Sequence, residues 1–353
     1  MEQCMLKDGL SGIMRAKNEA QFIEASIDSC IDALDELIIV YNDCTDETPE
    51  IVERKRKQYP DKIKAFEYNH NILSHNLTRE EFEYAISLPE DSPRLHSTQC
   101  NYALSKVTYK YAVKIDPDQI YFAEELKIWR DVCSGDNKIT WRLSFILGWL
   151  FMVYISAYRR ISVRKSRPCL EMLPQWLVDN LKKPYEDFAK WQLQRNKVAI
   201  VISGVNVFYD KEWYIPFDKY NVHPPYNGAS DHLIFRVTNR TFFTRLYGYE
   251  QPYTVIEVFH QPNKMMFADT PLWFHQHANR IRCWSRVKKV KDEYPELFVP
   301  IEKFVDMTYE EVNVKMDSQV NTLFQRTSFA LVHKMGVGNV KKYLGLLMLK
   351  PLK

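Results

Sequence analysis

Short apolar runs alternate with segments of helical periodicity along the first third of the chain. The runs 10–16, 36–43 and 62–68 are typical of buried strands, and the second is continuous, as in a parallel strand covered on both faces. Between them, residues 18–34 space their apolar side chains at helical intervals, and residues 44–59 combine cap candidates, an early proline and a charged face. The pattern predicts an α/β sheet connected by right-handed crossovers.

A further predicted strand, residues 109–115, ends at two aspartates separated by one proline, after a helix predicted at 96–106. In open α/β sheets, ligands gather beyond the carboxyl ends of the strands. Side chains two apart on an extended chain point to the same side, so Asp116 and Asp118 can present both carboxylates to one divalent cation. Taken alone, such a pair is more often a solvated turn, and the interpretation depends on neighbouring motifs.

The second half of the chain begins with an uncharged segment, residues 143–158. As a helix it would span roughly 24 Å, which is short of the roughly 30 Å hydrocarbon core of a bilayer. Two alternatives remain: a buried core helix, or a segment that lies at a membrane surface or lines a lipid-acceptor groove. The flanking Arg142, Arg159 and Arg160 favour the membrane surface, where anionic headgroups would meet them.

Composition narrows the class of protein. The 353 residues suffice for one large domain or two ordinary ones, and a net charge of +3 from 48 basic and 45 acidic residues gives no sign of a nucleic-acid partner. Only 10 residues are glycine, which argues against a glycine-fingerprint nucleotide fold. Seven widely spaced cysteines without a C-x-x-C pair, and a start unlike a signal peptide, predict reduced thiols in the cytoplasm.

Three sequence motifs occur along the chain in the same order as in a known protein family. Residues 11–53, with K-N-E at 17–19 and N-D-C-T-D-E-T at 42–48, resemble the opening of family 2-type glycosyltransferases of the GT-A fold. K-I-D-P-D-Q-I-Y-F at 114–122 takes the place of the D-x-D motif of that family. Strands are predicted at 198–210. Residues 204–221, and a helix predicted from Ser230 or Asp231 in G-A-S-D-H within 228–240, resemble the acceptor side of that family.

The resemblance implies a GT-A fold, with a mixed central sheet flanked by helices, a largely helical acceptor-side insertion and a C-terminal extension. The expected nucleotide-sugar-binding half is 1–125, and the insertion, with acceptor or membrane contacts, is 126–197. Residues 198–280 would complete the same catalytic domain as its acceptor-side half. Residues 281–353 would form the helical extension.

The same resemblance implies roles for individual residues. Arg15, Lys17 and Glu19 would lie around the nucleotide base, and Asn42 would contact the uridine. Asp116 would face the ribose or the metal, and Asp118 would bind the metal that bridges the diphosphate. Asn42 stands where the family usually has an aspartate, and Tyr41 replaces the acid before it, so the identity of the nucleotide stays open.

Asp231 stands where the family places its catalytic base, which would take the proton of the acceptor hydroxyl in an inverting transfer. The alternative is a helix N-cap, since Ser230 and Asp231 precede an amphipathic run. His275 or His277 would supply a nitrogen to the metal. Their spacing of two does not match a helical ligand pair, so we expect at most one to reach the site, or both to be packing residues.

The predicted function is transfer of a sugar from a nucleotide donor, expected to be a UDP-sugar, with Mn²⁺ or Mg²⁺ as cofactor. The acceptor would be a saccharide or a lipid-linked glycan in the synthesis of a surface polysaccharide such as lipopolysaccharide or capsule. The enzyme would be cytoplasmic, or peripheral at the inner face of the cell membrane, and would bind no nucleic acid. The lysine- and leucine-rich residues 341–353 could contact an anionic bilayer or pack as a last helix.

Two other functions remain open. A sugar nucleotidyltransferase would share a related sheet but commonly has a glycine-rich loop after the first strand, and residues 14–22 contain no glycine. A non-catalytic glycan-binding protein at a membrane surface would keep its binding after loss of Asp118 or Asp231.

Overall fold

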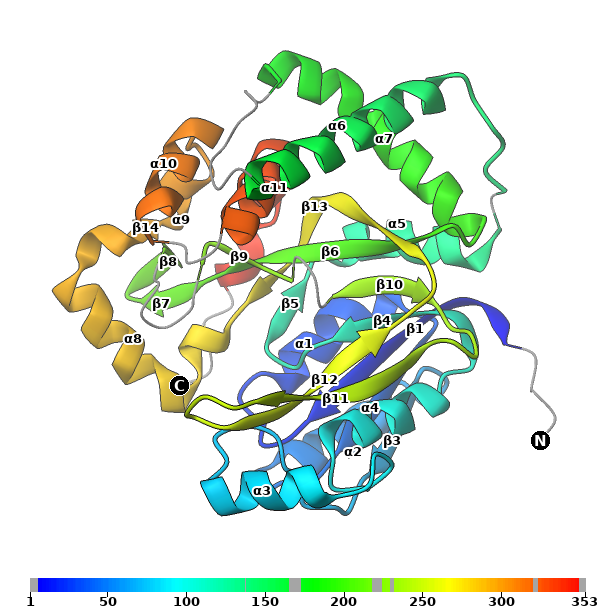
Figure 1. Ribbon diagram of the computed structural model, residues 1–353, viewed down its shortest axis with the longest axis vertical. Helices are drawn as coiled ribbons and strands as arrows, with labels where there is room; N and C mark the ends of the chain where they lie inside the picture. Colours follow the sequence, from blue (N-terminus) through cyan, green and yellow to red (C-terminus); the bar gives the residue numbers. More distant parts are fainter. Residues whose placement is uncertain are drawn as a thin grey trace. The chain divides into compact units, whose positions relative to one another are not determined.

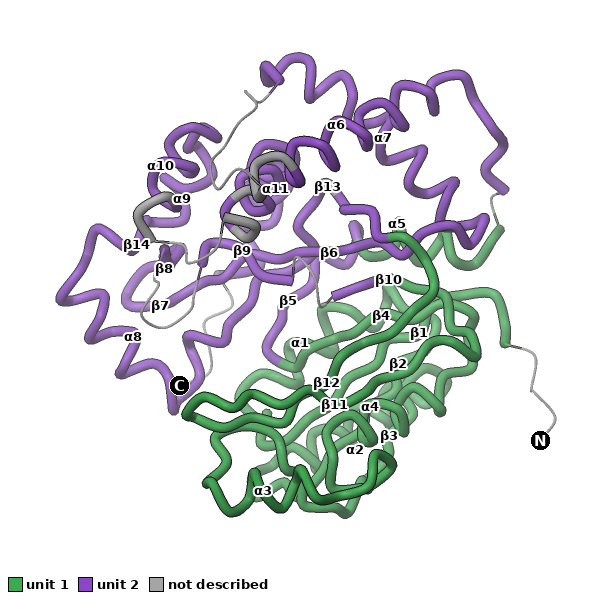
Figure 2. Tube along the Cα trace, viewed as in Figure 1, with its two compact units in different colours: residues 1–117, 126–136, 234–264 green, residues 118–125, 137–233, 265–353 purple. Residues whose placement is uncertain are grey.

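The chain forms two compact units, described here one at a time (Figure 2). Unit 1 consists of residues 1–117, 126–136 and 234–264, and unit 2 of residues 118–125, 137–233 and 265–353. The computed structural model describes residues 6–136, 138–164, 173–217, 224–228, 232–319 and 323–348.

Unit 1 is built on a mixed sheet (Figure 1). Its strands are β1 (Lys7–Ala16), β2 (Glu36–Tyr41), β3 (Ile63–Glu67), β4 (Tyr109–Ile115) and β10 (Leu233–Arg236). The order is β3-β2-β1-β4-β10, in which the first four strands run parallel and β10 runs antiparallel to β4. Leu37 to Val40 are completely buried. The four parallel strands predicted from the apolar runs are therefore confirmed.

The helices of unit 1 are α1 (Ile23–Cys30), α2 (Thr48–Gln58), α3 (Arg79–Ser87), α4 (His96–Ser105) and most of α5 (Ala123–Ser134), with the 3₁₀ turn η1 (Ile31–Ala33) after α1. Local sequence explains their starts: α2 has its proline in the first turn, and α3 begins with a capping box between Thr78 and Glu81. Helix α4 packs against β1 and β2 and also against a hairpin of β11 (Phe242–Gly248) and β12 (Thr254–His260).

The helix predicted from Ser230 or Asp231 is wrong for the residues that the structure describes. Residues 233–236 form strand β10, whose Leu233, Ile234 and Phe235 are buried and which pairs with β4. A short apolar run fits a buried strand as well as a helix turn, and here pairing with the sheet decides between them. Ser230 and Asp231 themselves lie outside the described residues.

Unit 2 contains a second group of strands. β5 (Gln119–Tyr121), β6 (Val198–Asn206) and β13 (Lys264–His275) lie in the order β6-β13-β5, and β9 (Tyr226–Asn227) also pairs with β6. A smaller antiparallel sheet has the order β14 (Phe298–Pro300), β8 (Glu212–Pro216), β7 (Phe208–Asp210). The strands predicted at 198–210 are thus confirmed as β6 and β7.

The remaining elements of unit 2 are mainly helical, as predicted for the insertion and the extension. They are α6 (Ser144–Arg164), α7 (Gln175–Gln194), α8 (Ile281–Glu293), α9 (Ile301–Phe304), α10 (Tyr309–Gln319) and α11 (Leu323–Lys342), with the 3₁₀ turns η2 (His277–Asn279), η3 (Pro295–Leu297) and η4 (Leu344–Met348). Helices α6, α7 and α11 pack on one another. Leu344, Leu346 and Leu347 join the core cluster of unit 2, and Tyr343 stacks on Phe122 with centroids 4.5 Å apart. For residues 343–348, the packing alternative therefore holds.

Helix α6 has two different faces. Phe145, Phe151, Ile155 and Tyr158 are buried, so the core-helix alternative describes one side of it. Leucine, isoleucine, valine and tryptophan side chains on its other side are exposed. Within the described part of the chain, no helix is both long enough and apolar enough to cross a bilayer.

Gly204 in β6 gives a test of packing in unit 2. A Cβ at this position would overlap the indole ring of Trp273 on β13, whose Nε1 donates to Asn227 at 3.0 Å. We expect Gly204→Ala to lower the free energy of unfolding by about 1–3 kcal/mol, because a rigid buried ring must move. Denaturant unfolding measures this.

Gly338 in α11 is the matched control, since a Cβ there meets nothing within 4 Å. Gly338→Ala should leave stability unchanged or raise it by up to about 1 kcal/mol through helix propensity. Equal losses in both variants would show that the indole of Trp273 does not constrain β6.

Candidate functional site

Three of the predicted site residues follow the carboxyl ends of neighbouring parallel strands in unit 1. Lys17 follows β1, Asn42 follows β2 and Asp116 follows β4. The register aligns Ala16 with Tyr41 and Met14 with Ile115, so the strand ends are nearly level. Loop residues at this edge of a parallel sheet are the usual place for a ligand.

The two N-terminal sequence motifs are hydrogen-bonded to each other at this edge. The backbone N–H of Glu19 donates to Thr48 Oγ1 at 2.7 Å, and that of Ala20 donates to Asp46 Oδ2 at 3.0 Å. In the other direction, the N–H of Thr45 donates to Asn18 Oδ1 at 2.7 Å. These bonds fix the loop after β1 against the loop after β2, and they explain why both segments are rich in small hydrogen-bonding residues.

Lys17 and Asn42 differ in their surroundings. Lys17 is exposed, and its Nζ lies 3.8 Å from Asp43 Oδ2. Asn42 is buried, and its Oδ1 accepts from Gln99 Nε2 of α4 at 2.8 Å. Uncharged Asn42 can be buried beside a neutral amide at less cost than an aspartate, which fits the departure from the family pattern. The nucleotide contacts of both residues stay predictions.

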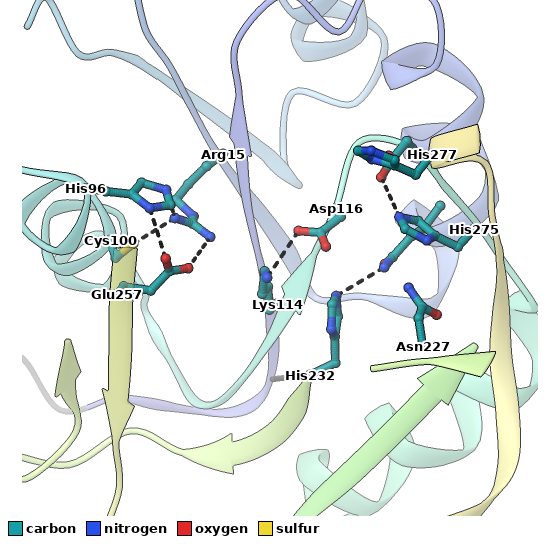
Figure 3. Close-up of polar contacts among 12 residues, drawn as sticks. Arg15, His96, Cys100, Lys114, Asp116, Asn227, His232, Glu257, His275 and His277 are labelled. Carbon is teal, nitrogen blue, oxygen red and sulfur yellow. Dashed lines mark hydrogen bonds and ion pairs between the residues drawn. The ribbon is translucent and has the colours of Figure 1, made fainter. Parts of the chain in front are cut away.

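Arg15 lies in a largely buried polar cluster of unit 1 (Figure 3). Its guanidinium donates to Glu257 Oε1 of β12 at 2.9 Å, to Cys100 Sγ of α4 at 2.8 Å, and to His96 Nε2. Because His96 Nδ1 lies 2.9 Å from Glu257 Oε2, each ring nitrogen of His96 has the partner that a neutral imidazole needs. We call Arg15, His96, Cys100 and Glu257 the Arg15 cluster.

The Arg15 cluster shifts the pKa values of its members. Burial and the neighbouring Arg15 charge lower the pKa of His96 to about 4, although Glu257 acts in the opposite direction. Burial would raise the pKa of Glu257, but Arg15 and His96 outweigh it and hold that pKa well below its usual range. The cluster is therefore an ion pair of Arg15 and Glu257 bridged by neutral His96.

The ligand atoms of His96, Cys100 and Glu257 lie within 4.8 Å of one another, as in a metal site. The guanidinium of Arg15 contacts all three side chains, and a second cation among them would be repelled. We therefore assign these residues to positioning Arg15. Sequence reasoning missed His96 and Glu257; the available signal was a single acid within the apolar strand of residues 254–259.

Asp118 lies in unit 2, where it is almost fully buried and surrounded by nitrogen atoms. Arg280, at the start of α8, donates to Asp118 Oδ2 from Nε at 3.0 Å and from Nη2 at 2.9 Å. His275 Nε2, at the end of β13, lies 3.4 Å from Asp118 Oδ1. His277 Nδ1 lies 3.5 Å from Asp118 Oδ2. We call Asp118, His275 and His277 the Asp118 triad.

The expectation that at most one of the two histidines reaches the site is wrong. Their spacing excludes a helical pair, but the chain leaves β13 and enters the 3₁₀ turn η2 at His277. The N–H of Gln276 donates to the carbonyl oxygen of Asp118 at 2.8 Å, which fixes this bend against the residue that both histidines face. The two imidazole rings, both labelled in Figure 3, have centroids 5.8 Å apart.

Asn206 of β6 determines which nitrogen of His275 carries the proton. The Asn206 amide Nδ2 donates to the carbonyl oxygen of Pro224 at 2.6 Å, so its Oδ1 must be the atom that faces His275 Nδ1 at 2.7 Å. His275 therefore donates from Nδ1, and in the neutral ring Nε2 holds a lone pair that points toward the Asp118 carboxylate. Two electron-rich atoms 3.4 Å apart require a cation between them, either a proton or a metal.

Electrostatics keep Asp118 ionised. Burial raises the pKa of a carboxyl group, but here the charge of His275, hydrogen bonds from His275 and His277, and the charge of Arg280 hold the pKa of Asp118 well below its usual range. The hydrogen bond to Asp118 raises the pKa of His277, yet burial and the nearby cations outweigh it, and the net shift is downward. An ionised carboxylate that faces two imidazole nitrogens is a set of groups that can bind a divalent metal ion.

Asp116 has different surroundings from Asp118. It belongs to unit 1, is half-buried, and its Oδ1 lies 3.6 Å from Lys114 Nζ. Strand β4 ends at Ile115 and β5 begins at Gln119, so the two aspartates lie in a turn and not on one extended strand. The pairing of both carboxylates on one cation stays a prediction.

Comparisons with known proteins agree with the motif analysis. Residues 9–135 match the family model described as Beta-1,4-N-acetylgalactosaminyltransferase (CgtA). No curated protein matches the chain at a significant level.

Solved structures show a distant likeness. TarS from S. aureus, residues 1–349, is 13% identical over 97% of this chain and 75% of its own, with a TM-score of 0.31. Glucosyl-3-phosphoglycerate synthase from Mycobacterium tuberculosis is 19% identical over 44% of this chain and 51% of its own, with a TM-score of 0.23. In another TarS structure the match covers 35% of this chain and 19% of that one.

Within residues 9–135, the match to a glycosyltransferase family model agrees with the α/β sheet and the ordered motifs of unit 1. The matched residues contain most of β1 and all of β2 to β4, and therefore the strand ends at which Lys17, Asn42 and Asp116 lie.

The neutral state of His96 predicts a pH dependence of stability. The unfolded chain binds a proton at His96 below its ordinary pKa of 6.5, whereas the folded chain does so only near about 4. Stability contributed by this group is therefore present at neutral pH and lost as the pH falls, by about 2 kcal/mol between about pH 7 and about pH 5. Thermal unfolding at several pH values measures the loss.

His96→Asn should flatten this pH dependence by about that amount, because the residue that titrates is gone. Exposed His70 provides the control, and His70→Asn should keep the slope of the unaltered protein. An unchanged slope in the His96 variant would contradict the neutral bridge.

Proposed function

We propose that the protein is a metal-dependent glycosyltransferase that moves a sugar from a nucleotide donor, with UDP as the carrier, to a saccharide or a lipid-linked glycan. The observation that carries this proposal is the Asp118 triad: a buried, ionised carboxylate faces a histidine nitrogen whose proton is held on the opposite side of the ring by Asn206. An ordered second-layer partner of this kind is typical of metal-ligating histidines.

The residues present fit a divalent ion. Ligand atoms about 2.1 Å from an ion lie about 3.0 Å apart at right angles and slightly further apart at wider angles. The 3.4 Å between Asp118 Oδ1 and His275 Nε2 falls in this range, and His277 adds a further nitrogen. Imidazole ligands favour a transition metal, so we propose Mn²⁺ ahead of Mg²⁺.

Each part of the site then has a role. The ion supplies positive charge that stabilises the departing diphosphate. Arg280 holds Asp118 in place through Oδ2, which leaves Oδ1 directed at His275. In unit 1, the loops after β1 and β2, with Arg15, Lys17, Glu19 and Asn42, would contact the nucleotide, and Asp116 its ribose or the metal.

Asp231, at a position that the structure does not describe, is proposed as the base that takes the proton of the acceptor hydroxyl. Attack on the face opposite the leaving diphosphate would invert the anomeric centre. The product would extend a surface polysaccharide of the lipopolysaccharide or capsule type. The enzyme would work in the cytoplasm, peripheral to an anionic membrane surface.

Donor turnover tests the proposal. With UDP-sugars as probes, we expect slow donor hydrolysis that stops after chelation and returns with Mn²⁺. Asp118→Asn should lower the metal-dependent rate by at least about tenfold, because the ionised ligand is lost. Rates are measured as UDP released.

Asp210 is the matched control: a buried aspartate of unit 2, paired with Lys288 and Lys291 at 3.2 Å and 2.8 Å. Asp210→Asn should lower the free energy of unfolding by about as much as Asp118→Asn does. Donor hydrolysis by this variant should still stop after chelation and return with Mn²⁺. Full activity in chelator would contradict the metal role, and release of pyrophosphate from a nucleoside triphosphate would indicate a nucleotidyltransferase.

A second substitution tests the base. Asp231→Asn should lower turnover by about 10²-fold or more, while UDP still raises the unfolding temperature, because general-base catalysis is lost and donor binding is kept. Neighbouring Ser230→Ala serves as the control and should remain active. Retention of the anomeric configuration in the product would exclude the proposed role of Asp231.

A further inference from the structure

Helix α6 in unit 2 carries an apolar surface that the donor site does not use. We call it the α6 face: Leu143, Ile146, Leu147, Trp149, Leu150 and Val153. Their side chains are between 42% and 72% exposed, although soluble surfaces usually expose large apolar side chains singly. Trp141, directly before the helix, is 58% exposed as well.

The α6 face is one continuous stripe. Positions 143, 146, 147, 150 and 153 recur at three- and four-residue intervals, which places them on one side of a helix over about 15 Å of its length. The opposite side, with Phe145, Phe151 and Ile155, packs inside unit 2, where α6 contacts α7 and α11 (Figure 1). The helix is thus anchored by one side and leaves the other exposed.

The charged residues between positions 137 and 170, the segment that contains the α6 face, are all basic. Exposed Lys138 and Arg142 precede the stripe and exposed Arg160 follows it, and the sequence has no acid between Asp136 and Glu171. Arg159 is directed inward, with its guanidinium 3.7 Å from the ring centroid of Phe267. On neighbouring α7, Asp187 and Glu186 pair with lysines of the same helix.

We propose that the α6 face docks on an anionic lipid bilayer, with α6 parallel to the membrane plane. This inference rests on the peripheral membrane association proposed above, and it identifies the α6 face as the surface that contacts the membrane. Aliphatic side chains would enter the boundary between headgroups and acyl chains, tryptophans suit that boundary, and Arg142 and Arg160 would meet lipid phosphates.

A second copy of the chain fits this surface less well. In a symmetric pair of α6 faces, the arginines at the two ends of one stripe would approach those of the other, and the stripe offers no carboxylate to neutralise them. A bilayer with anionic headgroups supplies the missing negative charge along the whole stripe.

Vesicle flotation tests the proposal with the full chain. The probes are vesicles of phosphatidylcholine alone and of an equal mixture of phosphatidylcholine and phosphatidylglycerol. We expect binding to the mixed vesicles that weakens as salt is added. Arg142→Gln with Arg160→Gln should weaken binding by about fivefold for each charge removed.

The double variant Leu147→Glu with Leu150→Glu should abolish flotation, because two carboxylates would have to enter the bilayer boundary. Val314→Glu on α10 is the matched control, since Val314 is 72% exposed and lies outside the α6 face. It should float like the unaltered protein. Both sets of variants should keep their unfolding temperature, because the altered side chains are largely exposed.

Three results would overturn the proposal: no flotation with either vesicle, flotation that survives the leucine substitutions, or a dimer that those substitutions dissociate. The last result would assign the α6 face to a second copy of the chain. Donor hydrolysis measured on the same samples separates the two proposals, because a chain that floats without turning over UDP-sugars would contradict only the enzymatic one.

Discussion

The ionised, buried carboxylate of Asp118 is the interaction on which the candidate site of unit 2 depends. A charge without solvent must be neutralised nearby, and here Arg280 neutralises one oxygen while the other faces His275 Nε2. Asn206 fixes that nitrogen by accepting from the opposite side of the ring. Asp118 directly precedes β5, while Asn206, His275 and His277 belong to β6, β13 and the turn η2, so the arrangement depends on segments that are far apart in the sequence.

Unit 1 also contains a largely buried charge that is neutralised by its neighbours. The Arg15 cluster holds a cation and an anion in a largely buried position, and neutral His96 lies between them, with Nε2 accepting from Arg15 and Nδ1 2.9 Å from Glu257 Oε2. This arrangement orients the Arg15 side chain at the end of β1 through contacts from α4 and β12, which lie far away in the sequence. A chain that binds a charged donor benefits from such preorganisation, since the groups need not be reordered when the ligand arrives.

The two sides of helix α6 lie in different environments: one side packs inside unit 2, and the other is exposed. Its buried aromatic side chains join it to α7 and α11, while its exposed aliphatic side chains and flanking arginines have the composition of a membrane interface. The sequence alone presents these residues as a single uncharged stretch. Only packing separates them into a face that stabilises the fold and a face that is available to a partner.

The sequence by itself determined the parallel strands of unit 1 and the residues that follow them, because apolar runs and loop motifs are local signals. It also determined the helical character of the insertion and the extension. The tertiary structure decided that residues 233–236 form a strand, that both His275 and His277 reach Asp118, and that His96 and Glu257 hold Arg15. Each of these depends on pairing or packing between distant segments, and no local periodicity encodes such contacts.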